Sequence, residues 1–206
     1  MKDILLLGKR IVPDKSEILL SGTNELNWTE KWQVMGGKWS FEDGILVGEE
    51  LGNSGGILFT RDCYEDDVMI SCKISSYLPA TRDLNALYCA YWDEKTDYLK
   101  SAYICGVNGW YDGKSGIERF PENGLNTTTT LYKYTPGTEI SLCAGAINGH
   151  NFITVDGELV TELIDPNPLK GGHVGFSPYC TKLKIRDIEI RKIYWEKRDQ
   201  AYDPEF

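Results

Sequence analysis

The chain has 206 residues, of which 41% are hydrophobic and 12% aromatic, and it carries a formal net charge of −9 at pH 7. This hydrophobic content excludes an intrinsically disordered chain and is sufficient for one sizeable core. The negative charge argues against nucleic acids and anionic membrane surfaces as partners, because a phosphate backbone is bound through clustered basic side chains. Neutral or cationic ligands fit this charge better.

The N-terminus has an apolar run of only four residues, from Ile4 to Leu7. This run is too short for the core of a signal peptide or for a membrane span, so we expect a soluble, cytoplasmic protein. Six cysteines stand singly, without the CxxC or CxxH spacing that is typical of zinc sites. We therefore expect free thiols, most of them buried in strands.

The predicted elements are short strands separated by clusters of Gly, Asn, Asp and Pro. Residues 1–21 form a loose lead-in, and Asp43-Gly44 is a hairpin turn. No window shows the 3.6-residue apolar period of a helix. The strands expected in the first half of the chain are 17–20, 38–42, 45–47, 55–59, 67–74, 84–92 and 101–107.

Residues 108–134 are rich in turn residues and have few apolar anchors, which predicts a long irregular loop. Loops of this length are usually functional or disordered. Its first part carries Trp110, Tyr111, Glu118 and Arg119. We expect residues 108–126 to close over a ligand groove.

Residues 140–163 contain two turn dipeptides, Asn148-Gly149 and Asp156-Gly157. Both tolerate the positive φ of a type I′ turn, so a three-stranded meander is predicted. Two-residue turns set the pairing of opposite residues, which are Ile147 with His150, Gly145 with Phe152 and Val155 with Glu158. Apolar side chains fall on both faces of this meander. The second face is therefore expected to line a groove or to be covered by another segment.

The last strands are expected at 174–176 and 183–193, where a change of apolar parity at Arg186-Asp187 predicts a bulge. The charged tail, residues 196–206, is expected to fray. Many short strands and tight turns predict an all-β, two-sheet antiparallel sandwich or jelly roll. We expect one domain over residues 1–206, with its core at about 28–193.

Aromatic side chains are the richest candidate ligand contacts, because sugar rings stack on them while sugar hydroxyls form directed hydrogen bonds. Trp110 either lines a groove or packs its loop against the protein. In the strand at 84–92, alternation puts Asn85 and Tyr91 on one face and Tyr88 and Trp92 on the other. We expect the first pair to face the groove, since burying an unpartnered Asn costs about 1–3 kcal/mol.

Glu118 and Arg119 are adjacent in the predicted loop and could act as a general acid or base and as a hydroxyl or oxyanion clamp. The alternative is a solvated ion pair. His173, which follows two glycines, is the third candidate catalytic residue. Asp93-Glu94 lacks the further oxygen ligands that calcium requires, so no metal-binding residue is predicted.

The order of several motifs resembles the concanavalin-A-like jelly rolls of the 3-keto-disaccharide hydrolase domain family, and more closely the YesU-like family. The resemblance covers about Trp28 to Ile193. It implies a concanavalin-A-like fold and sugar chemistry or sugar recognition on a concave sheet. The motifs that carry it are WSFEDGILV, GGILF, DLNALYCAYW, VDGELV, GGHVGF and KIRDIEI.

The resemblance also assigns roles to individual positions. Asn85 takes the place of an Asn near the family's groove, and Arg186 matches the arginine of its closing strand. The family's histidine after the last core strand falls on Tyr179. Where the family presents Glu, Gln and Asp, this sequence has Tyr103, Cys105 and Asn108. The substrate-binding set expected overall is Asn85, Tyr91, Tyr103, Asn108, Trp110, Ser177, Tyr179 and Arg186.

The leading functional hypothesis is a jelly roll that binds or acts on a small saccharide or glycoside in a concave groove. For an enzyme, the resemblance implies cleavage of the glycosidic bond of an oxidised (3-keto) sugar, with Glu118, Arg119 and His173 as catalytic candidates. Oxidation at C3 acidifies the neighbouring C–H, so that one base can drive elimination. The alternative is a non-catalytic carbohydrate-binding or accessory module. No cofactor is predicted, and use of a divalent metal stays open.

Overall fold

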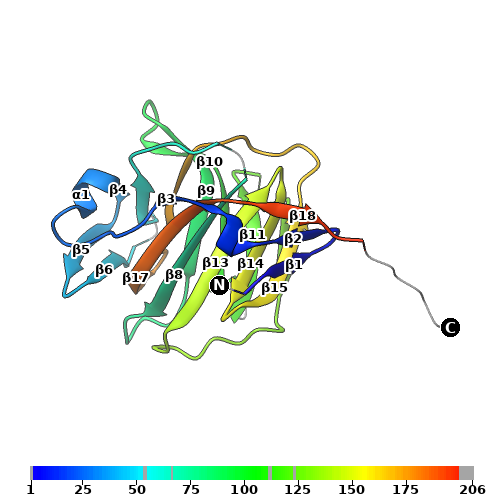
Figure 1. Cartoon of the computed structure of the whole chain (residues 1–206). Coiled ribbons are helices and arrows are strands. Elements are labelled where there is room, and N and C mark those ends of the chain that lie inside the picture. Colours follow the sequence, from blue (N-terminus) through cyan, green and yellow to red (C-terminus); the bar gives the residue numbers. More distant parts are fainter. Residues whose placement is uncertain (1, 53–54, 66, 111–112, 123, 200–206) are drawn as a thin grey trace.

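The computed structural model describes residues 2–52, 55–65, 67–110, 113–122 and 124–199, which form three antiparallel sheets (Figure 1). The seven-stranded sheet contains, in order, β12 (Asn126–Thr129), β11 (Lys114–Phe120), β10 (Tyr98–Trp110), β9 (Leu84–Asp93), β16 (His173–Phe176), β7 (Ile57–Thr60) and β4 (Trp32–Gly36). The eight-stranded sheet contains β15 (Glu158–Ile164), β14 (His150–Val155), β13 (Ile140–Ile147), β8 (Val68–Ser76), β17 (Thr181–Lys192), β6 (Ile45–Glu50) and β5 (Lys38–Glu42), with β3 (Glu17–Leu20) also paired to β17. The three-stranded sheet contains β1 (Ile4–Leu6), β2 (Lys9–Ile11) and β18 (Trp195–Lys197).

The two large sheets pack face to face around the main core. Alternate residues of each strand point into it, as the two-residue period of a strand requires. Leu84, Ala86 and Tyr88 of β9 face Leu142 and Ala144 of β13 across this core. The predicted two-sheet antiparallel jelly-roll sandwich is confirmed. A four-residue helix, α1 (Trp28–Lys31), and a 3-10 turn, η1 (Pro13–Lys15), interrupt the strands.

The predicted meander is confirmed in its register. Ile147 pairs with His150, Gly145 with Phe152, and Val155 with Glu158. Its inner face contributes to the main core, and its outer face belongs to a second apolar cluster. Of the two alternatives expected for this outer face, a groove or a covering segment, the structure shows the covering segment.

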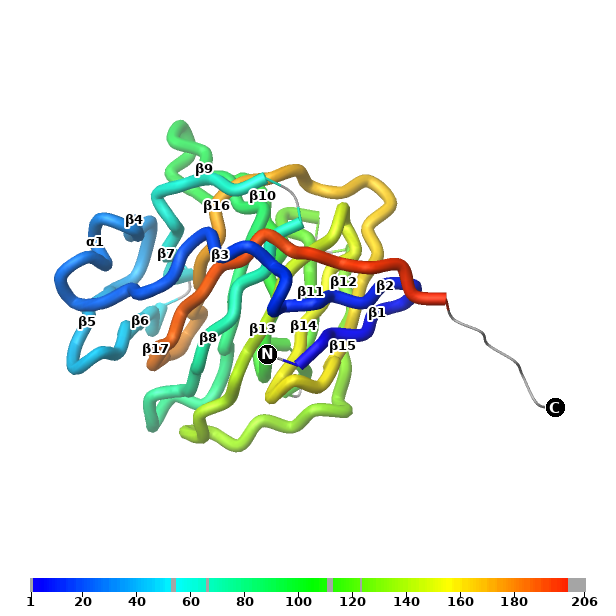
Figure 2. Tube along the Cα trace, in the orientation of Figure 1, coloured from blue at the N-terminus to red at the C-terminus, as the bar shows by residue number. Residues whose placement is uncertain are grey.

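The covering segment is the three-stranded sheet, built from both ends of the described chain. Figure 2 shows the blue N-terminal hairpin and the red C-terminal strand side by side across the eight-stranded sheet. Ile4, Leu6 and Ile11 pack there against Met69 and Phe152. The sequence analysis expects only one strand, at 17–20, in the lead-in and a fraying tail, whereas the structure adds β1, β2 and β18. Their three-residue strands are too short for a clear alternation of apolar and polar residues.

The closing strand carries the predicted bulge. The pairing of β17 with β8 shifts between Arg186 and Glu189, and Asp187 has φ of 53°. The expected long loop at 108–134 is wrong, because β10 continues to Trp110 and pairs with β11, which pairs in turn with β12. β11, β12 and the end of β10 were missed because they are rich in Gly, Ser and Thr and have few apolar side chains. Tyr111, expected in the same loop, lies outside the described residues.

All six cysteines are free, and four of them, Cys72, Cys89, Cys105 and Cys143, are buried, as predicted. Burial raises the pKa of both Cys105 and Cys143 to about 12, so these thiols stay protonated at neutral pH. None of the helices within the described ranges is long and apolar enough to span a membrane.

Candidate functional site

A groove of about 860 Å³ runs along the outer face of the seven-stranded sheet. Its position follows from strand alternation, because Asn85 and Ile104 point outwards where their neighbours point into the core. The residues that line it are Gly55, Ile57, Thr81, Arg82, Asp83, Asn85, Trp92, Tyr98, Leu99, Ile104, Asn108, Gly109, Trp110, Gly113, Glu118, Phe120, Ser177 and Tyr179.

The floor of the groove is apolar and aromatic. Ile57, Leu99, Trp92, Ile104 and Phe120 line it and also belong to a cluster of packed hydrophobic side chains on this outer face. A sheet face that looks outwards is usually polar, so an apolar outer face with a groove in it is typical of a binding surface.

One wall of the groove is polar and is formed by the residues that lead into β9. Asp83 is 3% exposed, and its carboxylate pairs with Arg82, whose Nε lies 2.5 Å from Asp83 Oδ2. Asn85 Nδ2 donates to Asp83 Oδ1 at 3.3 Å. The other amide atom, Asn85 Oδ1, is buried and accepts no hydrogen bond from the described protein. A buried acceptor without a donor costs about 1–3 kcal/mol, so this atom marks a place where a ligand donor is favourable.

Gly109 of β10 leaves the room that this polar wall needs. A Cβ atom at Gly109 would lie 2.9 Å from Asp83 Oδ1 and 3.0 Å from Asn85 Oδ1. Any other residue would crowd both oxygens and close this part of the groove. Burial raises the pKa of Asp83 above its usual 3.8, although the ion pair with Arg82 and the hydrogen bond from Asn85 act in the opposite direction.

A second wall comes from the β10–β11 hairpin. Trp110 Nε1 donates to Glu118 Oε2 at 3.0 Å, which joins an indole ring to a carboxylate across the two strands. The pairing of β10 with β11 shifts between Gly106 and Trp110, and Asn108 has φ of 56° within this bulge. Asn108 Nδ2 donates to the carbonyl oxygen of Thr81 at 2.7 Å and holds the two walls together.

Six of the residues predicted from the sequence as site residues line this groove: Asn85, Asn108, Trp110, Glu118, Ser177 and Tyr179. The sequence analysis missed Arg82, Asp83, Trp92 and Tyr98. Strand alternation could not have found Asp83, because its φ of 58° departs from extended backbone just before β9, and only the tertiary structure places it beside Asn85.

Trp92 lines the groove in place of Tyr91 because β9 contains a bulge. Cys89 has φ of 50°, and the pairing with β16 shifts where His173 lies opposite Ala90 and Gly175 opposite Leu87. The extra residue reverses the alternation beyond Cys89. Tyr91 is instead 42% exposed, and its hydroxyl donates to the carbonyl oxygen of Lys170 at 3.3 Å.

Arg119 and Tyr103 do not reach the groove, since both point to the inner side of the sheet. Arg119 Nη1 and the Tyr103 hydroxyl lie 2.9 Å and 2.6 Å from Asp165 Oδ2. Arg119 therefore lies on the opposite face from its neighbour Glu118, and the predicted pair is separated by the sheet. The same Tyr103 oxygen accepts a hydrogen bond from the backbone N–H of Leu169 at 3.0 Å.

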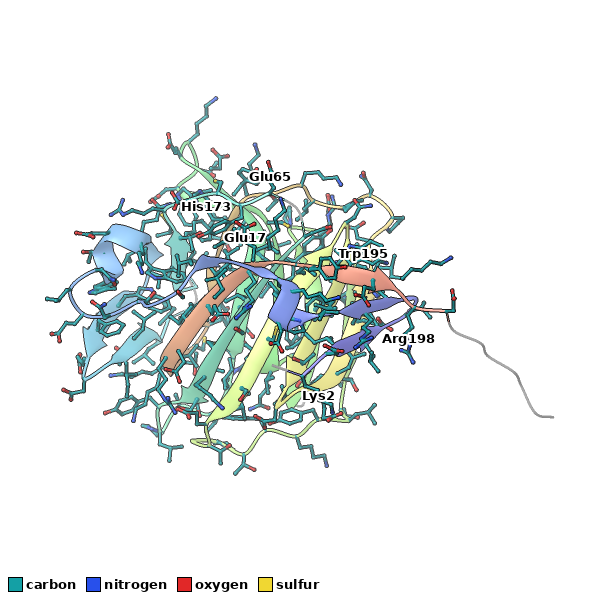
Figure 3. All side chains as sticks on the ribbon, in the orientation of Figure 1. Lys2, Glu17, Glu65, His173, Trp195 and Arg198 are labelled. Carbon is teal, nitrogen blue, oxygen red and sulfur yellow. The ribbon has the colours of Figure 1, made fainter. Side chains whose placement is uncertain are left out.

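His173 and Arg186 also lie outside the groove. The His173 ring stacks on Phe59, with 5.2 Å between ring centroids, and its Nε2 lies 3.4 Å from Cys63 Sγ. Figure 3 labels His173 near the upper edge of the molecule. Arg186 pairs with Glu139 on the eight-stranded sheet. The structure thus places one of the three catalytic candidates, Glu118, in the groove.

Metal-ligating side chains do not gather in the described part of the chain. No three His, Cys, Asp or Glu side chains there are arranged to hold a metal ion.

No family model matches this chain, and no curated protein matches it. Solved structures do resemble it in fold. A Bacillus subtilis protein of unknown function with a galectin-like fold superposes with a TM-score of 0.70 at 14% identity, over 88% of this chain and 98% of that chain. The carbohydrate-binding module CBM66 from the same species gives a TM-score of 0.63 at 16% identity, over 84% and 98%. A structure described as a native glycosidic hydrolase gives 0.54 at 11% identity, over 79% and 90%.

Proposed function

We propose that this protein binds a saccharide or glycoside in the groove on the outer face of its seven-stranded sheet. The observation that carries the proposal is the pairing of an aromatic floor with a polar wall whose buried acceptor, Asn85 Oδ1, has no partner. A pyranose ring has apolar C–H faces and a rim of hydroxyls, so it is complementary to such a groove. The carbohydrate-binding module among the similar folds supports the same reading.

Replacing Trp110 with alanine is expected to weaken saccharide binding about fivefold, because an aromatic stacking contact contributes about 0.5–1.5 kcal/mol. The melting temperature should change little, since Trp110 is half-buried on the groove wall rather than in the core. Titration calorimetry with the best sugar from a glycan panel measures the affinity. Trp195→Ala is the matched control, because this tryptophan lies on β18 of the three-stranded sheet (Figure 3) and does not line the groove. Unchanged affinity together with a large drop in melting temperature would assign Trp110 a packing role.

Affinity is expected to fall as the pH is lowered towards the raised pKa of Asp83. The ionised carboxylate accepts the hydrogen bond from Asn85 Nδ2 and so turns Asn85 Oδ1 to the ligand. A protonated Asp83 donates to Asn85 Oδ1 instead and occupies that acceptor. Because the pKa lies above 3.8, the loss begins at a higher pH than for a solvent-exposed aspartate. Binding isotherms across the acid range measure this loss. In the Asp83→Asn variant, this dependence of affinity on pH should disappear. If it persists in that variant, another titrating group is responsible.

The second candidate function is cleavage of an oxidised glycoside, and the presence of two carboxylates in one groove supports it. Glu118 could take the proton from the carbon next to a C3 ketone while the glycosidic oxygen leaves with a proton from Asp83. The pKa of Asp83 is raised in the direction that an acid needs. Arg119 and His173, the other two catalytic candidates predicted from the sequence, lie outside the groove. Asp83 therefore takes their place in this proposed mechanism.

Incubation with 3-keto-glycosides and their unoxidised parents tests the catalytic candidate, with divalent metal or chelator added in parallel. Release of the aglycone from the keto form, abolished in Glu118→Gln, would support elimination. His173→Ala serves as the control, because its side chain lies outside the groove, and it should retain activity. Binding without turnover of either sugar form would leave saccharide binding as the function.

A further inference from the structure

Five side chains that line the groove already direct a nitrogen donor at an acceptor of the protein. Trp110 Nε1 donates to Glu118, and Trp92 Nε1 donates to Asp97 Oδ1 at 3.3 Å. Asn108 Nδ2 donates to Thr81, as described above. Arg82 Nε and Asn85 Nδ2 both point at the Asp83 carboxylate. The Nε of Arg82, the one described cation that lines the groove, is therefore engaged by a carboxylate of the protein itself.

Acceptors of the groove remain open to a ligand. Asn85 is 6% exposed, and its Oδ1 is buried and accepts nothing from the described residues. The carboxylates of Asp83 and Glu118 are acceptors when ionised. A ligand that enters this groove is favoured when it donates hydrogen bonds, and it is penalised when it brings further acceptors.

The charge of the groove points in the same direction. Among the described residues that line it, Arg82 supplies one positive charge, and Asp83 and Glu118 supply two negative charges. Asp83 is in direct contact with Arg82 and offsets it, which leaves Glu118 as the uncompensated charge. The whole chain, these three residues included, carries a formal net charge of −9 at pH 7. A carboxylate or sulfate on the ligand therefore meets net repulsion, because the one cation among the described lining residues, Arg82, is already paired with Asp83.

We infer that the groove selects neutral or amino sugars and rejects uronates and sulfated sugars. This inference rests on the proposed saccharide binding and specifies its ligand class. The discriminating residue is Glu118, because its carboxylate faces a ligand without a basic partner among the described lining residues. Asn85 adds selectivity for a hydroxyl or ammonium donor over an acceptor.

The experiment compares oligosaccharides that differ only in charge. Matched β-1,4-linked oligomers of glucose, glucosamine and glucuronate, and α-1,4-linked oligomers of galactose and galacturonate, are measured by calorimetry and by tryptophan fluorescence at low and high salt. Within whichever linkage binds, the uronate is expected to bind about tenfold more weakly than its neutral counterpart. High salt should reduce that gap, because it screens the repulsion, and it should leave binding of the neutral sugar unchanged.

Two charge-removing variants identify the source of the selectivity. Glu118→Gln should narrow the gap between the neutral sugar and the uronate by about threefold, as expected for removing one charge near a ligand. Glu139→Gln removes one charge on the other sheet and should leave the gap unchanged. A uronate that binds wild-type protein as tightly as its neutral counterpart would overturn this inference and leave saccharide binding intact. Failure of every sugar in both sets to bind would overturn the proposed function as well.

Discussion

Replacing Asp165 with asparagine is expected to lower the free energy of unfolding by about 3 kcal/mol, because the change removes one partner of a buried ion pair. The Asp165 side chain is 1% exposed, and that of Arg119 is 15% exposed. The carboxylate also accepts hydrogen bonds from the Tyr103 hydroxyl and from the backbone N–H of Asn167. This network ties the segment that follows β15 to the inner side of the seven-stranded sheet.

The pH dependence of stability gives this prediction a second readout. Burial raises the pKa of Asp165, but the hydrogen bonds from Tyr103, Asn167 and Arg119 together outweigh it and lower the pKa below 3.8. A carboxyl whose pKa is lower in the folded state stabilises the fold above its unfolded pKa, and that contribution is lost as the pH falls through the folded value. In the Asp165→Asn variant this carboxyl is absent, so the free energy of unfolding should fall less between neutral and acid pH than it does in the wild type.

Urea unfolding at neutral and acid pH measures both effects. Asp199→Asn is the matched control, since Asp199 is exposed, and its free energy of unfolding should match that of the wild type. A loss of under about 1 kcal/mol in Asp165→Asn would place this pair among ordinary surface contacts.

Replacing Asn85 with leucine is expected to weaken saccharide binding at least tenfold, while the melting temperature stays the same or rises. Leucine has nearly the same shape but no acceptor for the ligand, and losing a buried hydrogen bond to a ligand costs about 1–3 kcal/mol. The stability should not fall, because Asn85 Oδ1 has no donor in the described protein and the hydrogen bond from Asn85 Nδ2 to Asp83 is long at 3.3 Å.

Ser115→Ala is the matched control for this prediction. Ser115 Oγ is also buried without a hydrogen-bond partner, but β11 turns it to the inner side of the sheet, on the same side as Ile117. Its removal should leave binding unchanged. If Asn85→Leu lowered stability and left affinity intact, the orphan acceptor would be a packing feature and not a ligand contact. Calorimetry and thermal melting of the two variants separate these outcomes.

Local turn chemistry carried much of the fold prediction. The register of the meander depends on Asn148-Gly149 and Asp156-Gly157, and each pair acts through its own φ angles without help from distant residues. The apolar residues on both faces of the meander predicted either a groove or a covering segment on its outer face, and the structure decided for a covering segment made by the two ends of the described chain. The closing bulge could be recognised because an inserted residue changes the parity of a long apolar strand.

The candidate site was decided largely by tertiary structure. A bulge at Cys89 exchanged Tyr91 for Trp92 at the groove, and no local residue pattern marks that bulge. Glu118 and Arg119 looked like one functional pair in a loop, but as strand residues they face opposite sides of a sheet.

The sequence by itself determined the strands whose apolar alternation and turns are local, and it determined the excess of negative charge. Only the tertiary structure decided which polar groups meet. Asp165 reaches Arg119, and Cys63 reaches His173, through the stacking of strands that are distant in sequence. Partners of this kind depend on the order of strands in a sheet, which is set by the packing of the whole core and not by any one segment.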